Sequence, residues 1–262
     1  MIDELKNIVR NTGNRILAWR NTAVAEGKWE GTQFKCRADK LAHKELCEKL
    51  RMLAPTVPVI SEEDEHSQVA NRPERYWLID PIYGTASFAH GYDGYVTQVA
   101  LMRYGFPTLA AIYAPSLKLL FLAQEGKGAY LNGKRFFCQN TEEFQTLIDN
   151  YPQPRGVTLA AFKELHFEHY VECGGISLKI CRVADGSADL FFKDVVVRDW
   201  DLGAPHLVLH EAGGTLTDVN GRDIAYRQSY RKDGLIAAPS KKMALRFASW
   251  YESHLEGSSA EK

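Results

Sequence analysis

Residues 77–88 of the chain read WLIDPIYGTASF, and this stretch decides how the whole sequence is interpreted. Its apolar start predicts a buried β-strand, and Asp80 places a carboxylate at the end of that strand. Pro81 holds the preceding residue extended and fixes a turn. Gly84 lets the backbone approach an anion closely, and Thr85 adds an N–H group and a hydroxyl. The stretch therefore predicts a strand that leads into a phosphate and metal site.

The composition is that of an ordinary globular protein. The chain has 262 residues, of which 45% are hydrophobic and 25% are charged, and its formal net charge is −1. This length allows one large domain, or two small ones, with a sizeable core. The charge balance offers no general surface for a nucleic-acid polymer or a membrane, so we expect neither as a partner.

The N-terminus and the cysteines favour a cytoplasmic protein. Residues 1–19 alternate apolar and polar residues at helical spacing and lack the apolar core of a signal peptide, and no other run approaches a membrane span. The cysteines are odd in number and form no C-x-x-C pair, so neither a disulfide framework nor a zinc site is indicated. They are Cys36, Cys47, Cys138, Cys173 and Cys181.

Helices are predicted on both sides of a sheet-rich middle, which indicates a layered α/β protein. The first two cover residues 2–19 and 39–53, and Asp39 is a candidate cap for the second, because an Asp side chain accepts from free N–H groups. Residues 135–173 read as mixed short elements. Strands are expected at 57–61, 76–80, 95–104, 108–115, 118–126, 128–134, 188–197, 215–219 and 234–239, and further helices at 199–214 and 241–255.

Acidic residues stand at three element ends. Glu62 and Glu63 follow one predicted strand, Asp80 ends another, and Asp199 and Asp201 open a helix. Hard cations such as Mg²⁺ bind carboxylate and carbonyl oxygens, and three separate segments that each offer an acid suit such a site. Each group alone also has an ordinary explanation, either as a solvated acidic turn or as a charge that favours a helix N-terminus.

These motifs together resemble the inositol monophosphatase superfamily of Mg²⁺-dependent, lithium-sensitive phosphatases. The signature W-[IL]-[IV]-D-P-[IL]-D-G-T-x-x-F matches residues 77–88 except at Tyr83. A second signature, W-D-x-[AG]-A…E-A-G-G, matches WDLGAPHLVLHEAGG at residues 200–214, and the acidic pair matches SEED at 61–64. The order and spacing agree from the N-terminal helix to about Pro239, so the resemblance covers nearly the whole chain.

The resemblance implies a fold and an assembly. It predicts a layered α/β/α/β/α sandwich with two β-sheets, formed as a single domain over residues 1–262. The approximate halves are residues 1–140 and 141–262, and the site is expected between them. Homodimers are common in the family, so a homodimer is possible here.

The resemblance also implies a set of metal ligands. Glu62, Asp80 and the carbonyl of Ile82 match the first metal site. Asp80 would bridge to a second ion, which Asp201 also holds. A third ion, where present, would draw on Glu62 and on the position that Tyr83 fills. One Mg²⁺ is expected to bind firmly, and the second is expected to bind weakly because of Tyr83.

The resemblance assigns the remaining catalytic roles. Gly84 and Thr85 match the phosphate-binding turn, an Asp39–Thr85 pair would help to activate the attacking water, and Glu63 would position that water. The reaction implied is in-line attack on a phosphate monoester, with two ions about 4 Å apart and no covalent phospho-enzyme. Cys36 replaces the usual threonine three residues before Asp39, and packing as a small hydrophobe is its simplest role.

Tyr83 is the main departure from the family pattern. A phenol with a reference pKa of about 10 is neutral at pH 7 and binds Mg²⁺ poorly. Four interpretations stay open: an active phosphatase with a weakened second metal, a protein that binds its ligand without hydrolysis, altered chemistry with the phenol as proton donor, or a deliberate Asp→Tyr change. The intact acids favour a protein that still binds metal.

The substrate is expected to be a small phosphorylated nucleotide or sugar. GISLKICRVADG at residues 175–186 is similar to the G-S-S-L-K stretch of the bisphosphate nucleotidases, which favours a 3′-phosphoadenosine 5′-phosphate-type substrate. Ser177, Lys179 and Asp201 are the predicted contacts, with Lys179 as a point charge for a second phosphate. The alternative for Lys179 is an exposed lysine on a strand. We expect His90, His206 and His210 to be packing residues, because the site needs oxygen ligands.

Overall fold

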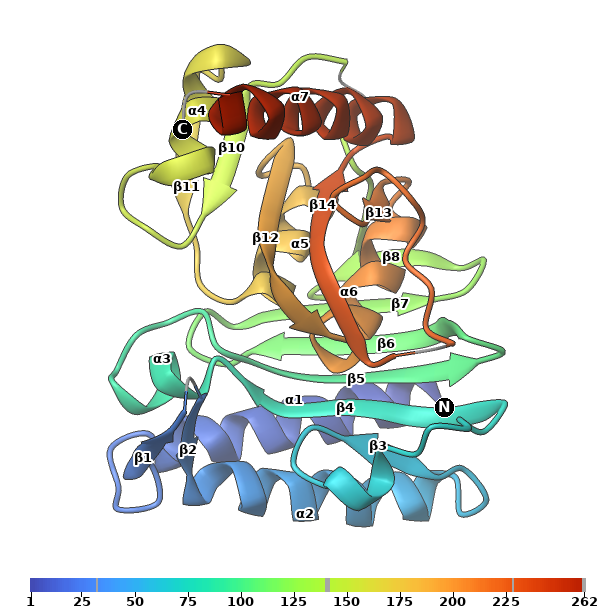
Figure 1. The fold of residues 1–262 in the computed structure, drawn as a ribbon. Helices are drawn as coiled ribbons and strands as arrows, with labels where there is room; N and C mark the ends of the chain where they lie inside the picture. The colour runs from blue at the N-terminus through green and yellow to red at the C-terminus, as the bar shows by residue number, and fades with distance from the viewer. Residues whose placement is uncertain (32, 140–141, 228, 261–262) are drawn as a thin grey trace.

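Two β-sheets alternate with three layers of helices in the computed structural model, which describes residues 1–31, 33–139, 142–227 and 229–260 (Figure 1). From bottom to top in that view, the layers are α1 with α2, a seven-stranded sheet, α5 with α6, a five-stranded sheet, and α4 with α7. The predicted α/β/α/β/α sandwich with two sheets is therefore confirmed.

The seven-stranded sheet forms the first half of the molecule, with α1 (Ile2–Trp19) and α2 (Arg37–Leu53) on its outer face. Buried α1 residues recur at helical spacing and pack on the sheet with Leu46, Trp77 and Val99. The strands run in the order β3-β4-β5-β6-β7-β8-β9, and only the β3–β4 pair among them is parallel. Their bounds are Val59–Ser61, Arg75–Tyr83, Val96–Arg103, Phe106–Ala114, Leu119–Gln124, Gly128–Leu131 and Lys134–Phe136.

The five-stranded sheet forms the second half, with α4 (Gly156–Glu164) and α7 (Lys241–Ala260) on its outer face. Phe192 and Phe247 pack between this sheet and α7, with ring centroids 4.9 Å apart. The strands run in the order β11-β10-β12-β14-β13. In that order their bounds are His169–Glu172, Thr146–Asp149, Leu190–Arg198, Arg231–Ala238 and Thr215–Thr217.

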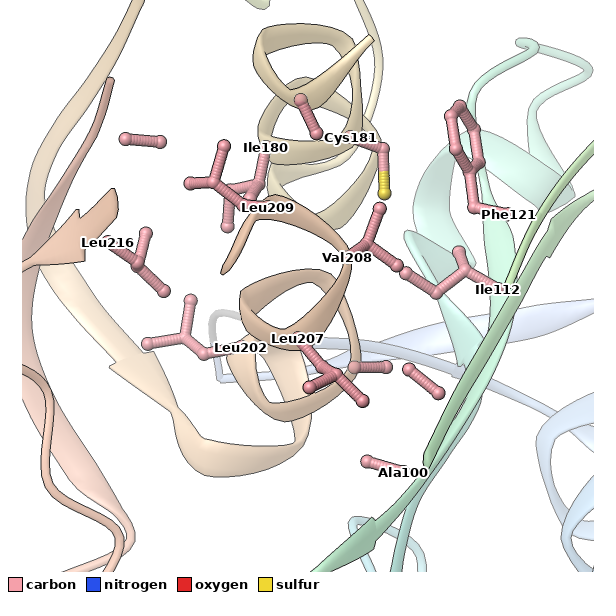
Figure 2. Close-up of a cluster of buried hydrophobic side chains, with 14 of the residues drawn as sticks. Ala100, Ile112, Phe121, Ile180, Cys181, Leu202, Leu207, Val208, Leu209 and Leu216 are labelled. Atoms are coloured by element: carbon pink, nitrogen blue, oxygen red, sulfur yellow. The ribbon is translucent and has the colours of Figure 1, made fainter. Parts of the chain in front are cut away.

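The middle layer joins the halves through the largest hydrophobic core. Helices α5 (Ile176–Ala184) and α6 (Asp199–Glu211) lie between the sheets and contribute side chains such as Ile180 and Leu207. Figure 2 shows Cys181 of α5 and Val208 of α6 directed towards Phe121 and Ile112 of the seven-stranded sheet. Because this core holds both helices against the first half, the first turn of α6 has a fixed position between the halves.

Most predicted elements are present, and several short ones were missed. The hairpin of β1 (Gly27–Glu30) and β2 (Gln33–Cys36) was not predicted, because its four-residue strands are too short for a clear pattern. Helix α5 was not assigned either. Two short helices, η1 (Glu65–Ser67) and α3 (Thr85–Ala89), were also not predicted. In the part of the chain that the structure describes, no helix is long and apolar enough to cross a membrane.

Candidate functional site

Three chain segments bring one buried and two partly buried acids together between the halves. Strand β3 ends at Ser61, which pairs in parallel register with Ile79 of β4, so Glu62 lies beside Asp80. Asp201 is in the first turn of α6, where its Oδ2 accepts from the Arg198 backbone N–H at 2.7 Å. The structure therefore brings together the three acids that the sequence predicted as metal ligands.

Asp80 is the most confined of these acids. Its exposed fraction is 0%, and neither of its carboxylate oxygens has a hydrogen-bond partner in the described residues. Burial raises its pKa well above the usual value, and the charges of Glu62 and Asp201 raise it further. A buried carboxylate without donors is costly unless a cation compensates it. Asp80 thus has the environment of a ligand for a positive ion.

The pKa values of the two neighbouring acids are raised as well. Burial, followed by the charge of Glu63, raises the pKa of Glu62 to about 7. Burial raises the pKa of Asp201 to about 8, although the hydrogen bond from Arg198 opposes the shift. Raised pKa values on adjoining carboxyl groups indicate a cluster whose members repel one another when they are ionised.

The acids and a neighbouring backbone carbonyl are groups of the kind that hold a hard cation. Glu62, Asp80 and the Ile82 carbonyl supply oxygen ligands of the kind that Mg²⁺ prefers. The Ile82 carbonyl oxygen lies 3.0 Å from the Thr85 hydroxyl oxygen, and its two lone pairs allow it to face an ion as well. Within the described ranges, no group of three or more His, Cys, Asp or Glu side chains is arranged to hold a metal ion. The position where the family has another acid is filled by Tyr83.

The predicted Asp39–Thr85 pair is formed. The Thr85 hydroxyl donates to Asp39 Oδ1 at 2.9 Å, while Asp39 Oδ2 accepts from the Cys36 backbone N–H at 2.9 Å. Helix α2 begins at Arg37, so Asp39 is the third residue of its first turn and not the residue that precedes the helix. Burial raises the pKa of Asp39, and these hydrogen bonds partly offset the shift. Gly84 has a φ of 89°, a conformation that favours glycine, just before α3.

Glu63 and a lysine that the sequence analysis overlooked form an ion pair beside this site. The Lys35 ammonium lies 3.0 Å from Glu63 Oε1, and only 8% of the Glu63 side chain is exposed. The role of Glu63 in positioning water stays a prediction. Lys35 lies on the short hairpin strand that periodicity did not detect, so no local signal marked it as part of the site.

Tyr83 closes one side of the acid cluster. Its ring lies over Gly175, where a Cβ atom would stand 2.5 Å from Tyr83 Cε1. Gly175 directly precedes Ile176, the first residue of α5, so the ring lies at the start of that helix. Burial and the charge of Asp201 raise the pKa of the phenol well above its usual value, so it stays protonated. Gly175 is a residue that sequence reasoning missed.

Two predicted substrate contacts are used inside the protein. The Ser177 hydroxyl is buried and donates to the Asp201 carbonyl at 2.9 Å, which ties α5 to α6. Lys179 lies on α5 and not on a strand, and its exposed fraction is 2%. Its ammonium donates to Asn150 Oδ1 at 3.0 Å. Lys179 is therefore buried while its partner Asn150 is exposed, and its predicted role with a second phosphate stays a prediction.

His206 and Cys36 are buried packing residues, as predicted, whereas His90 and His210 are exposed and make ring contacts at the surface. His206 Nδ1 is 2.9 Å from the Tyr226 hydroxyl, and the rings of His206 and His210 both contact Phe106. The His90 ring contacts Phe34 with centroids 5.2 Å apart. Burial raises the pKa of the Cys36 thiol to about 12, so it is not a thiolate at neutral pH.

A five-layered sandwich with buried acids and an aspartate–threonine pair between its halves defines the class of inositol monophosphatase-fold proteins. The profile of the inositol monophosphatase family matches residues 5–256, and the chain belongs to this family. The predicted enzyme class, the Mg²⁺-dependent phosphoric monoester hydrolases, is thereby confirmed at the level of the family.

Relatives of known name are similar over nearly the whole chain. The 3′(2′),5′-bisphosphate nucleotidase CysQ of Salmonella typhimurium is 31% identical over 240 residues, covering 89% of this chain and 98% of the relative. The putative Nus factor SuhB of Neisseria meningitidis is 30% identical over 236 residues, covering 85% of each. Among solved structures, the Thermotoga maritima IMPase has a TM-score of 0.80 at 22% identity, over 96% of this chain and 98% of that one. The structural similarity to the Thermotoga maritima protein shows that the two chains share the same fold.

Proposed function

We propose that the protein is a metal-dependent phosphomonoesterase that acts slowly on a small phosphorylated nucleotide, with a 3′-phosphoadenosine 5′-phosphate-type bisphosphate as the best candidate. The observation that carries the proposal is Asp80, whose buried oxygens lack donors beside Glu62 and near Asp201. The similarity to CysQ nucleotidases supports the substrate class.

Separate groups of this chain would bind the metal ion, bind the phosphate and accept the proton of the attacking water. Glu62, Asp80 and the Ile82 carbonyl would hold one Mg²⁺, which supplies positive charge to the phosphate oxygens when it is bound. The Gly84–Thr85 turn would receive the phosphate. Thr85, oriented by its 2.9 Å hydrogen bond to Asp39, would accept a proton from the attacking water and pass it towards that carboxylate.

Tyr83 makes the reaction slow in this proposal. A second ion would lack the carboxylate that the family pattern places at this position, so charge stabilisation of the attacking and leaving oxygens is incomplete. The deficit is expected to be several kcal/mol, and each ~1.4 kcal/mol corresponds to a factor of ten in rate. The alternative of a protein that binds a phosphorylated ligand without hydrolysing it rests on the same missing carboxylate.

Phosphate release from a panel of monoesters, with Mg²⁺ or Mn²⁺, tests the proposal on the native chain and on Tyr83→Asp. We expect slow release by the native protein and a rise of at least about tenfold in the variant, by the arithmetic above. Equal rates at saturating Mg²⁺ would contradict the role assigned to Tyr83.

Tyr83→Phe is the matched control for altered chemistry. It keeps the ring over Gly175 and removes only the hydroxyl, so a phosphatase impaired by the missing carboxylate should keep its low rate. If Tyr83→Phe abolishes an activity that Tyr83→Asp does not restore, the phenol is a proton donor. Absence of hydrolysis by both native protein and Tyr83→Asp, together with tight ligand binding, would favour the binding protein.

A further inference from the structure

The first turn of α6 carries Asp201, and polar contacts from other segments hold this turn. Asp199, at its start, is paired with Arg72 of the first half at 2.5 Å. The Asp201 carbonyl accepts from the Ser177 hydroxyl at 2.9 Å. It is open to this donor because Pro205, four residues further along the helix, has no N–H. Contacts from neighbouring segments therefore hold both ends of the Asp199–Asp201 segment.

Gln98 of β5 holds the residue between these ends. Its Nε2 donates to the Trp200 carbonyl at 2.6 Å, and the exposed fraction of Gln98 is 1%. This hydrogen bond joins a strand of the first half to a helix of the second half. Because Trp200 directly precedes Asp201 in the chain, a displacement of the Trp200 carbonyl would also displace the Asp201 side chain. The bond is therefore suited to fix the position of Asp201.

Gln98 is also the direct cross-strand neighbour of Asp80. The two residues are paired in antiparallel register between β4 and β5. Opposite residues of such a pair point to the same face of the sheet, with Cβ atoms about 4.5–5.5 Å apart. Since Gln98 reaches α6, Asp80 faces this helix as well. One side chain thus connects the strand position of Asp80 with the helix turn of Asp201.

The orientation of the Gln98 amide follows from its partner. A carbonyl oxygen only accepts hydrogen bonds, so the NH₂ group of the amide faces Trp200. The amide oxygen is buried without a hydrogen-bond partner among the described residues, and the same holds for both carboxylate oxygens of Asp80. Buried acceptors without donors are costly unless another group compensates them. Gln98 therefore does not donate to Asp80, whose oxygens stay open to a cation.

We infer that Gln98 is a positioning residue, which sets the place of Asp201 relative to Asp80 across the two halves and thereby the affinity for a metal ion. The inference rests on the proposed function and deepens it, because the spacing of these acids governs how strongly they attract a cation. Gln98 acts through the Trp200 backbone. Without its hydrogen bond the first turn of α6 is free to move away from β5, and the charge of Asp201 then attracts the ion less.

The binding test uses Gln98→Met, which keeps the length of the side chain and removes the donor. We expect the Kd for Mg²⁺, measured by calorimetry, to rise at least about tenfold, as is usual when a residue that orients metal ligands is lost. Stability should change little, because the lost hydrogen bond is offset by removal of the unpartnered amide oxygen. Thr97→Val is the matched control and should leave the Kd unchanged. Thr97 is buried in the same strand but faces Gly13 of α1.

A double-mutant cycle with Asp201→Asn shows whether Gln98 acts through Asp201. Once the Asp201 charge is removed, Gln98→Met should raise the Kd of the remaining site by less than about twofold, because the two changes share one route. A tenfold rise in both backgrounds would mean that Gln98 affects the ion by another route, and it would overturn the inference. An unchanged Kd in Gln98→Met alone would overturn it as well.

Hydrogen exchange in the metal-free protein separates this inference from the proposed function. The backbone amides of residues 202–204 should exchange at least about fivefold faster in Gln98→Met than in the native protein or in Thr97→Val. If the native protein binds no Mg²⁺, the proposed function fails, while faster exchange still supports the positioning of Asp201. Unchanged exchange would overturn the inference whether or not metal binds. Gln98→Asn, whose amide is one methylene too short to reach Trp200, gives the same reading if the methionine variant does not fold.

Discussion

The ring of Tyr83 and the backbone of Gly175 are in such close contact that any side chain at position 175 would collide with the ring. A Cβ there would stand 2.5 Å from Cε1 and 2.6 Å from Cδ1 of Tyr83. Gly175 has a φ of −56°, which an alanine also adopts, so the collision alone forbids a larger residue. The end of β4 and the start of α5 are therefore fitted to each other across the two halves.

Gly175→Ala is expected to destabilise the native protein by about 1–3 kcal/mol, the usual cost of overpacking a closed site. The same substitution should cost much less in a Tyr83→Ala background, because the ring is gone. Urea unfolding of the four proteins in the cycle measures the coupling. Costs that are equal in both backgrounds would show that the ring moves aside freely.

Asp80→Asn is expected to stabilise the metal-free protein and to remove its response to Mg²⁺. The native carboxyl is buried among acids and has a raised pKa, so its ionised form is disfavoured in the folded state. We expect the Tm of the metal-free variant to rise by about 2 °C or more, which corresponds to roughly 1 kcal/mol in a protein of this size. Thermal scans with and without millimolar Mg²⁺ measure both effects.

The control for that experiment is Asp3→Asn, because Asp3 is exposed on α1 and distant from the acid cluster. It should leave the Tm gain with Mg²⁺ as it is in the native protein. A native protein whose Tm does not respond to Mg²⁺ at neutral pH would contradict the metal site at Glu62, Asp80 and Ile82.

Loss of the Thr85 hydroxyl is expected to lower kcat by about a hundredfold, within the usual range for general acid–base groups. Asp39→Asn should have a similar effect, and the double variant should lose little more, since the two residues act as a unit. Steady-state phosphate release with saturating Mg²⁺ gives these values, with Thr85→Val as the isosteric change.

Thr108→Val is a matched control, because the Thr108 hydroxyl also donates a hydrogen bond, to the Leu101 carbonyl at 3.1 Å, but lies on β6 away from the acids. Its kcat should stay within about twofold of the native value, as expected for a change that leaves the transition state untouched. Additive losses from Thr85→Val and Asp39→Asn would mean that the two residues act separately.

Stability at alkaline pH is expected to report the burial of Lys179. Burial lowers the pKa of this lysine to about 8, although Asp149 opposes the shift. Its charged form is disfavoured in the folded state, so the unfolded chain holds more protons between pH 8 and about 10.5. The free energy of unfolding should therefore rise with pH in this window relative to Lys179→Met.

The expected difference between native protein and Lys179→Met grows by about 2 kcal/mol from pH 7 to pH 9.5, which follows from ~1.4 kcal/mol per pKa unit. Lys127→Met, at an exposed loop position, should show no such growth. Parallel pH dependence of native protein and Lys179→Met would mean that the lysine is already neutral or well solvated.

The sequence predicted those features that depend on residues within a single segment. Residue types and spacing predicted the strand that ends at Asp80 and the acids Glu62 and Asp201. The family resemblance predicted that these three acids lie together. The direction of the Tyr83 ring was not readable, because it depends on Gly175, which is 92 positions further along the chain. The partner of Lys179, Asn150, is distant for the same reason.

Arg198 and Tyr230 were also invisible to the sequence analysis. An arginine at the end of a strand and a tyrosine in a connecting segment are common on any protein surface. Both residues line a cavity of about 460 Å³ together with Lys35 and Glu62, and four separate chain segments create its wall. Only contacts between the two halves define such a wall, and no periodicity within one segment records them.

Gly94 and Gly174 form a close backbone contact between the halves. A Cβ on either residue would lie within 2.7 Å of the other's Cα, so the two backbones touch without intervening side chains. Away from Tyr83 the halves are joined as well, by the ion pair of Arg72 with Asp199 at 2.5 Å and by the hydrogen bond from the Tyr230 hydroxyl to the Val69 carbonyl. A side chain at position 94 or 174 would therefore push the halves apart on one side only, and the acids contributed by β4 and α6 would lose their common position.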